Sequence, residues 1–399
     1  MTSITTAARA TYVVFAACGF LLASWVARIP QLRDHLHLTP AALGWVLLGA
    51  AAGSLLSRPL SGPILARHGQ RRTVAATGAL AGAGLFVTGL SDVTGLGDVT
   101  GRWVLVAGLL AIGFTVSVWD VAMNVQGAEV ERRIGRSVMP RFHAAFAAGT
   151  VVGAGLAAGL VALHVPVTAH LGAVALVVAV AVPLAARDYL PEQPRGDAPP
   201  PASGRAWREP RTVLIGLFVL AFAFAEGAAG DWIGVALIDG HGATAALGSL
   251  GYAVYLAATT ATRWFGAVLL DRYGRVAVLR TLGAVTIGGL LLFVFGPNLP
   301  VALAGAALWG VGTAFGYPVG MSAGADDPAH AAARVTVIST LGKLASFAGP
   351  PLIGMVGDHV TVLRALLVVA ALQVVAVLVA GATRPLRAPE AVAAPAEVG

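Results

Sequence analysis

Long apolar runs separated by short polar breaks are the main pattern along the chain. Twelve such runs can be marked between charged or proline-rich breaks. Each contains roughly the 20 helical residues that about 30 Å of bilayer hydrocarbon requires. The runs cover 11–29, 41–66, 73–90, 103–127, 140–163, 168–186, 212–238, 246–270, 276–296, 299–324, 334–357 and 361–382. The pattern predicts an all-α membrane protein with twelve transmembrane helices.

Composition supports the same class of protein. The 399 residues are 57% hydrophobic and 11% charged, whereas soluble domains are about a quarter charged. A water-soluble fold is therefore excluded. The 50 glycines are compatible with transmembrane helices that approach each other closely. The single cysteine, Cys18, excludes a disulfide framework or a multi-cysteine metal site within one chain, and we expect neither metal nor cofactor.

The longest polar break divides the chain into halves. Residues 187–211 contain a proline- and alanine-rich tract that is typical of a flexible cytoplasmic linker. We therefore predict an amino-terminal six-helix bundle over 1–186 and a carboxy-terminal one over 212–383. Residues 384–399 have a similar composition and predict a flexible cytoplasmic tail.

The basic residues gather in alternate connections, and this asymmetry predicts the orientation. Cytoplasmic loops carry the excess of Lys and Arg, and the connections on one side carry most of them. The other side has Arg28, Arg33, Arg102 and Arg364. Both termini are therefore expected in the cytoplasm of a multi-pass protein in a bacterial inner membrane. The net charge of +7 is dispersed between apolar runs, which argues against a nucleic-acid partner.

The two halves repeat each other. Residues 39–44 (TPAALG) open the second run, and 244–248 (TAALG) open the eighth, with a threonine N-cap in both. Further along, Arg58, Arg67 and Gly69 recur as Arg263, Arg272 and Gly274, each displaced by 205 positions. Runs of the same direction carry them, so the repeats are parallel. Such halves enclose a solute cavity near the midplane and alternate its access by rocking.

The loop after the second run carries a recognisable motif. Its residues are Gly62, Arg67, Gly69, Arg71 and Arg72, and the second half carries Asp271, Arg272, Gly274 and Arg275. This pattern resembles the conformational motif of the major facilitator superfamily. The resemblance implies a transporter that works by alternating access and is not an enzyme. Ala66 stands where the family has an aspartate, so the carboxylate-centred latch is expected in the second half alone.

Within that superfamily the whole chain is most similar to YbjJ-type inner-membrane permeases and to the rhizopine transport protein MosC. The matching segments are 24–30 (SWVARIP), 123–132 (MNVQGAEVER) and 225–232 (AEGAAGDW). More distantly the chain resembles fucose permease, whose fourth span has Glu-x-x-x-Asn where this chain has Asp120 and Asn124. The aspartate in the first span of fucose permease has no counterpart here.

Six charged residues lie inside the predicted spans: Asp120, Glu226, Asp231, Arg58, Arg263 and Lys343. A charge at the centre of a transmembrane helix costs about 2.5–3.5 kcal/mol on insertion scales, so each needs a partner or a function. Mutual neutralisation is one explanation. Arg58 and Asp231 lie nearer the helix ends, and we treat them as charge-pair candidates that can also reach lipid headgroups.

Asp120 belongs to a polar stripe with helical spacing, made by Gly113, Ser117, Asp120, Asn124 and Gly127. Such a stripe should face a wet cavity or another helix. Partial desolvation would let an unpaired Asp120 exchange a proton during transport, and the alternative is a structural ion pair with an intramembrane arginine. Glu226 and His143 are further proton-coupling candidates, and the favoured alternative for His143 is an ordinary interfacial histidine.

Candidate solute ligands follow from polar and aromatic side chains inside the spans. Tyr hydroxyls, amides and cationic groups suit a sugar or a carboxylate, and aromatic rings stack on an apolar sugar face. The candidates are Ser117, Asn124, Tyr252, Tyr255, Arg263, Lys343, Trp25, Trp119, Trp309 and Tyr317. Ion pairing is the alternative for the two cations, and packing or interfacial anchoring is the alternative for the aromatic residues.

No nucleotide-binding loop, metalloprotease motif or nucleophile elbow is present in the sequence. Energy must therefore come from a gradient. We predict a secondary transporter for a small polar, sugar-like solute with proton coupling, acting as a monomer. Proton-coupled efflux of drugs or metabolites is the alternative, and a receptor that binds without transport is a third possibility.

Overall fold

The computed structural model describes residues 3–93, 97–135, 138–190, 205–327 and 330–386. This part of the chain is helical and contains no strand. The first half forms α1 (Ile4–Val26), α2 (Ile29–His35), α3 (Pro40–Leu90), α4 (Gly97–Ile134), α5 (Met139–Ala162) and α6 (Val167–Ala186). The rest forms η1 (Ala206–Arg208), α7 (Pro210–His241), α8 (Ala245–Phe265), α9 (Ala267–Tyr273), α10 (Arg275–Phe295), α11 (Leu299–Thr313), α12 (Gly316–Gly324), α13 (Ala331–Val360), α14 (Val362–Ala365), α15 (Leu367–Val379) and η2 (Ala380–Thr383).

The helices agree closely with the twelve predicted spans. Within the described chain, nine segments are long and apolar enough to cross a membrane. One of them, α3, contains two predicted spans that meet at the kink at Gly69. The long helices outside this set are α8 and α13, which carry Arg263 and Lys343. Their polar side chains lower the hydropathy of segments that the repeat pattern still identifies as spans.

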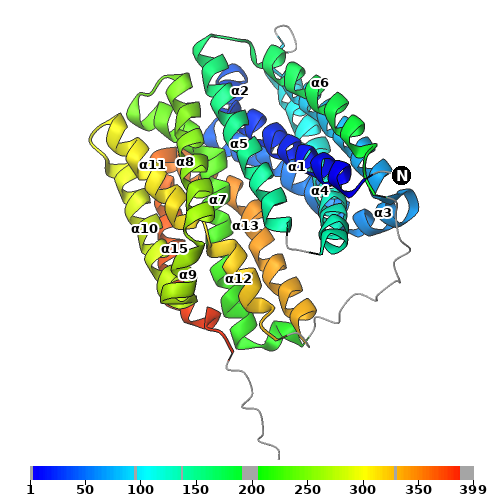
Figure 1. Ribbon diagram of the computed structural model, residues 1–399. Helices are drawn as coiled ribbons and strands as arrows, with labels where there is room; N and C mark the ends of the chain where they lie inside the picture. The colour runs from blue at the N-terminus through cyan, green and yellow to red at the C-terminus, as the bar shows by residue number, and fades with distance from the viewer. Residues whose placement is uncertain (1–2, 94–96, 136–137, 191–204, 328–329, 387–399) are drawn as a thin grey trace, which may run out of the picture.

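The helices of the two halves lie on different sides of the molecule in Figure 1, with α1–α6 on one side and α7–α15 on the other. In the first half α3 packs on α4 and α1 packs on α5, and in the second α10 packs on α11 and α7 packs on α13. Glycines allow this close approach. A Cβ atom added at Gly113 would lie 1.9 Å from the carbonyl oxygen of Ala50, and one added at Gly305 would lie 2.5 Å from the backbone nitrogen of Phe293.

The predicted repeat is visible in the backbone. Gly69 has φ 77° and ψ 168°, and Gly274, 205 positions later, has φ 77° and ψ 159°. Glycine adopts this positive φ without the steric cost that a Cβ imposes. The predicted N-caps are also present, since the Thr39 hydroxyl accepts from the Ala42 amide at 3.2 Å and the Thr244 hydroxyl accepts from the Leu247 amide at 3.4 Å.

The halves are joined on one side of the molecule. We call the side at which α1 begins and α6 ends the terminal side, and the other the opposite side. On the opposite side, Arg33 of α2 forms a two-pronged ion pair with Asp239 of α7, with Nη2 at 2.8 Å from Oδ1. The Asp358 carboxylate accepts from the Ala41 amide at 3.1 Å, and these contacts close this side.

Most of the predicted linker and tail lies outside the described residues, at 191–204 and 387–399. The described ends of the linker region are packed. Tyr189 and Leu190 are each 3% exposed, and Ala206 of η1 is also 3% exposed.

Candidate functional site

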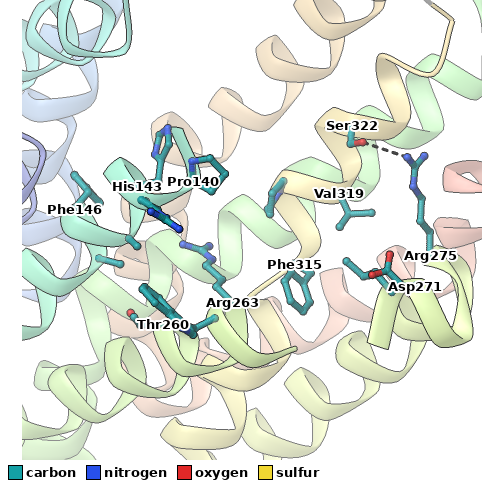
Figure 2. Close-up of a pocket in the computed structure, with 16 residues that line it drawn as sticks. Pro140, His143, Phe146, Thr260, Arg263, Asp271, Arg275, Phe315, Val319 and Ser322 are labelled. Carbon is teal, nitrogen blue, oxygen red and sulfur yellow. Dashed lines mark hydrogen bonds between the residues drawn. The ribbon is translucent and has the colours of Figure 1, made fainter. Parts of the chain in front are cut away.

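A cavity of about 840 Å³ lies between the two halves, toward the terminal side. The start of α5 forms one wall, and the end of α8 together with α9, α10 and α12 forms the other. Figure 2 shows side chains from these elements around the space: Pro140, His143, Phe146, Thr260, Arg263, Asp271, Arg275, Phe315, Val319 and Ser322. Both halves therefore contribute to one cavity, as the parallel repeat predicts.

His143 of α5 and Arg263 of α8 point toward one another across this cavity (Figure 2). Two hydrogen bonds fix the position of the Arg263 side chain. Its Nη2 donates to Oε1 of Glu226 at 2.7 Å, and its Nε donates to the carbonyl oxygen of Ala314 at 2.8 Å. Glu226 therefore has a cationic partner in this conformation. This is the ion-pairing alternative for Arg263.

Charged and polar groups from both halves surround Asp120. Its charge lies within electrostatic reach of His143, Lys343 and Arg58, and Tyr317 interacts with Asp120 and Arg58. We call these five residues the central charge cluster; they come from α3, α4, α5, α12 and α13. Asp120 is exposed, and its Oδ1 accepts from Nδ2 of Asn124 at 3.0 Å. Charged residues of both halves therefore act on Asp120, which places it near the interface between the halves.

The two cations of the central charge cluster have no direct partner. Within the described residues, neither Arg58 nor Lys343 forms a hydrogen bond or an ion pair, and both side chains are exposed. Each lies within electrostatic reach of the same carboxylate, Asp120. Polar groups at this depth are normally satisfied, so these two cations are available to a ligand or to water.

Four of the predicted aromatic ligands lie in the packed core. Trp119 and Trp309 are 0% exposed, Tyr255 is 3% exposed and Trp25 is 5% exposed. Tyr255 shares a hydrogen bond with the Thr313 hydroxyl at 2.9 Å and packs edge-on against Trp309. Packing, the alternative to solute stacking, therefore accounts for these residues in this conformation. The cavity wall instead carries Phe146, Trp264 and Phe315.

The remaining solute candidates occupy intermediate positions. Ser117, Asn124 and Tyr317 are half-buried. Tyr252 is also half-buried and stacks on Tyr255 with ring centroids 6.5 Å apart. Gly113 and Gly127, which share the predicted polar stripe, pack on Ala50 of α3 and Met139 of α5. The two ends of the stripe thus face neighbouring helices, and its centre faces the interface between the halves.

Arg58 and Asp231, the two charge-pair candidates, each form no ion pair within the described residues. Arg58 lies within electrostatic reach of Asp120. Asp231 lines a separate small cavity of about 10 Å³ with Ser249 and Tyr252, a volume that suits about one water molecule. The two residues were grouped because both lie near predicted helix ends, but the helix rotations place them in different surroundings.

The conformational motif lies on the terminal side, and its carboxylate does not hold the halves together there. Asp271 lines the cavity and forms no hydrogen bond or ion pair within the described chain. Arg275 turns away to Asp326, with Nη1 at 2.7 Å from Oδ1, and Nη2 of Arg211 donates to the other oxygen at 2.9 Å. Arg272 lies over the Tyr273 ring. The carboxylate latch expected of Asp271 is therefore not engaged. In the first half, Gly62, Arg67, Arg71 and Arg72 are exposed.

Three groups of charged residues were missed by sequence reasoning. Asp326 holds two arginines, and Arg33 and Asp239 connect the halves on the opposite side. Buried Arg28 donates from Nε to Nδ1 of His170 at 3.0 Å. A signal was present for Asp326, since paired acids at 326–327 follow the tenth span directly. The partners of the others come from distant helices, which the local pattern does not identify.

Known proteins of similar sequence are named as transporters or as membrane proteins. The chain matches the Major Facilitator Superfamily over residues 10–350. It is 30% identical to the uncharacterized transporter y4wD of Sinorhizobium fredii, over 86% of this chain and 89% of that protein. It is 29% identical to an uncharacterized MFS-type transporter of Yersinia pestis, over 87% and 88% of the two chains. It is 26% identical to the membrane protein MosC of Rhizobium meliloti, over 90% and 85%.

Solved structures of low sequence identity share the fold. The nucleoside transporter NupG superposes with a TM-score of 0.71 at 14% identity, over 96% of this chain and 99% of that one. FucP in the outward conformation superposes with a TM-score of 0.63 at 15% identity, over 94% and 99%. The predicted fold, two parallel six-helix repeats, is confirmed. The chain belongs to the major facilitator superfamily and is a multi-pass membrane transporter rather than an enzyme.

Proposed function

We propose that this transporter moves a small polar, sugar-like solute across the bacterial inner membrane and couples the movement to protons. The observation that carries the proposal is the central charge cluster, in which Asp120 faces cations from both halves next to a cavity of about 840 Å³. Similar solved structures are those of a nucleoside transporter and a fucose:proton symporter. This similarity favours a polar solute of sugar-like size.

The conformation supports transport by alternating access. The cavity lies toward the terminal side, where the Asp271 latch is not engaged. The opposite side is closed by Arg33 and Asp239. We assign the terminal side, with both termini, to the cytoplasm, because the basic loops lie there. The structure then represents an inward-facing state, and rocking of one half against the other would expose the same site outside.

Protonation of Asp120 provides the coupling step in this proposal. An ionised Asp120 attracts Arg58 of α3 and Lys343 of α13, which belong to opposite halves. Addition of a proton removes that attraction. It therefore changes the free energy difference between conformations in which the halves are close together, or apart, at the level of Asp120. His143 lines the cavity and lies within electrostatic reach of Asp120, so it can pass protons between the cavity and the carboxylate.

The test compares wild type with Asp120→Asn in proteoliposomes. A thermal-shift screen of sugars, inositols, sugar acids and cationic drugs first identifies a solute, because a ligand that binds the folded state stabilises it. We expect Asp120→Asn to keep exchange of labelled solute across the membrane and to lose accumulation driven by a pH gradient. Accumulation at the wild-type level would exclude Asp120 as the proton carrier.

The same assays separate the other functions. An exporter of drugs would show competition by unrelated apolar cations, and a receptor would bind solute without exchanging it across the membrane. Sedimentation of the protein in detergent tests the proposed monomer. Protease access to the tail at 384–399 in oriented vesicles tests whether it lies in the cytoplasm.

A further inference from the structure

We infer that the transported solute is an organic anion, a small polyhydroxy compound with a carboxylate, held between Arg58 and Lys343. This inference rests on the proposed transport function and specifies the charge of the solute. The site is the central charge cluster together with the adjoining cavity. The argument has four parts: the balance of charge, the position of the two cations, the competition with Asp120, and the lining of the cavity.

The charges of the site do not balance. Arg263 is neutralised by Glu226 at 2.7 Å. On the cavity wall, Arg141 and Asp271 carry opposite charges, and Arg275 is paired with Asp326. Within the described residues, Arg58 and Lys343 of the central charge cluster remain, and the carboxylate within their reach is Asp120. Two fixed cations therefore share one anion, whose Oδ1 is also occupied by the Asn124 amide. An uncompensated cation inside a membrane protein is costly, and a carboxylate from the solute would remove the excess of positive charge.

The two cations lie on opposite halves. Arg58 belongs to α3 in the first half and Lys343 to α13 in the second, and the two helices pack on each other. A carboxylate bound between them would contact both halves at once. Its binding would therefore change the free energy difference between the inward and outward states, which is the requirement for a transported solute.

Asp120 and a solute carboxylate would compete for the same cations. When Asp120 is ionised, it interacts with Arg58 and Lys343. When it binds a proton, both cations become available to the solute. Proton and anion should therefore bind together, and a monovalent anion carried with one proton crosses the membrane without net charge movement. The same residues thus account for coupling and for charge selection.

The cavity suits the rest of such a solute. Its volume of about 840 Å³ lies in the usual range for small-molecule sites, about 300–1,000 Å³. Thr260 and Ser322 offer hydroxyl groups on its wall, and Phe146 and Phe315 offer aromatic surface. Hydroxyl groups of the solute would find polar partners there, and its apolar face would find rings to pack against.

The experiment uses three probes with the same ring and different charge: D-glucuronate, D-glucose and D-glucosamine. The melting temperature of the purified full-length protein is measured with each at equal ionic strength. We expect glucuronate to raise the melting temperature most and glucosamine least.

Arg58→Gln and Lys343→Gln should each weaken glucuronate binding about tenfold or more. Arg58→Lys and Lys343→Arg, which keep the charge, should retain most of the shift. Arg9→Gln, at an exposed arginine outside the site, should retain all of it.

Two results would overturn the inference. One is stabilisation by glucose or glucosamine that equals or exceeds that by glucuronate. The other is the lack of stabilisation by glucuronate, galacturonate and gluconate, each at about 10 mM. Exchange of labelled solute in proteoliposomes tests the transport function separately. Anion binding without exchange would contradict the transport function and leave the anion site standing. Exchange of a neutral sugar without anion binding would support the transport function and contradict the anion site.

Discussion

At the scale of single residues, Gly113 shows how a side chain's absence can matter. It shares a face of α4 with Asp120, but a Cβ atom there would lie 1.9 Å from the carbonyl oxygen of Ala50. We expect Gly113→Ala to push α4 from α3 and to lower the free energy of unfolding by about 1–3 kcal/mol. Thermal unfolding of the purified protein, followed by the loss of its monodisperse peak in size-exclusion chromatography, measures this change.

Gly155 of α5 provides the matched control. No heavy atom lies within 4 Å of the position that its Cβ would occupy, and it lies inside a helix. Gly155→Ala should therefore leave stability unchanged or raise it by up to about 1 kcal/mol, since alanine costs less backbone entropy in a helix. Equal losses in both variants would show that the α3–α4 contact is not the reason for Gly113.

The same scale shows which residue roles the sequence could predict. The spacing of Ser117, Asp120 and Asn124 correctly grouped them on one face of a helix. It could not distinguish an aromatic residue that faces a cavity from one that packs, and Trp119 and Trp309 are in the core. That distinction depends on how each helix is rotated against its neighbours, which a periodic pattern along one helix does not contain.

At the scale of helices, the predicted ranges agree with the structure because length and hydropathy are local properties. The kink at Gly69 and the break between α9 and α10 at Gly274 lie at the two glycines that the repeat had aligned. Pairing between helices was harder to predict. Glu226 had been considered for proton coupling, and the structure pairs it with Arg263 from another helix. A single sequence does not show which residues of different helices pair; homologous sequences would be needed for that.

One pairing between helices should respond to pH. Glu209 precedes α7 outside the span, and its Oε2 accepts from Nε of Arg334 in α13 at 2.6 Å and from the Thr212 hydroxyl at 2.9 Å. The hydrogen bond from Arg334 lowers the pKa of Glu209 below its ordinary value. The pair therefore contributes stability above the pKa of Glu209 in the unfolded chain, and this contribution disappears as the pH falls through the lower folded value.

Glu209→Gln tests this pair. We expect the variant to melt a few degrees below wild type near neutral pH, because a partly exposed pair is worth up to about 1 kcal/mol. The difference should shrink as the pH falls below about 4.3, the ordinary glutamate value, and should vanish at more acidic pH. Melting curves from neutral to acidic pH provide the measurement. A constant difference across the whole range would mean that packing, not charge, links α7 to α13.

At the scale of the whole molecule, access to the site depends on which side holds the halves together. Within the described chain, the hydrogen bonds and ion pairs between the halves on the opposite side join Arg33 with Asp239, Asp358 with the Ala41 amide, and the Ser249 hydroxyl with the Ala27 carbonyl oxygen at 2.8 Å. Small residues also meet there, since a Cβ atom at Gly354 would lie 2.4 Å from the Pro40 carbonyl oxygen. Polar contacts of this kind can form and break as the halves rock.

The ion pair between Arg33 and Asp239 should therefore set the balance between inward and outward states. A reporter thiol at Val26, which lines the small cavity on that side, is suited to the measurement because the native Cys18 is 1% exposed. In the Val26→Cys background, Asp239→Asn removes a pair worth about 1 kcal/mol, so maleimide labelling should accelerate about fivefold. Asp98→Asn, at an exposed carboxylate, should leave the rate unchanged.

If Arg33→Gln added to Asp239→Asn gives no further increase, the two residues act as one contact. An unchanged rate in Asp239→Asn would show that the backbone contacts near Pro40 hold that side closed without the ion pair.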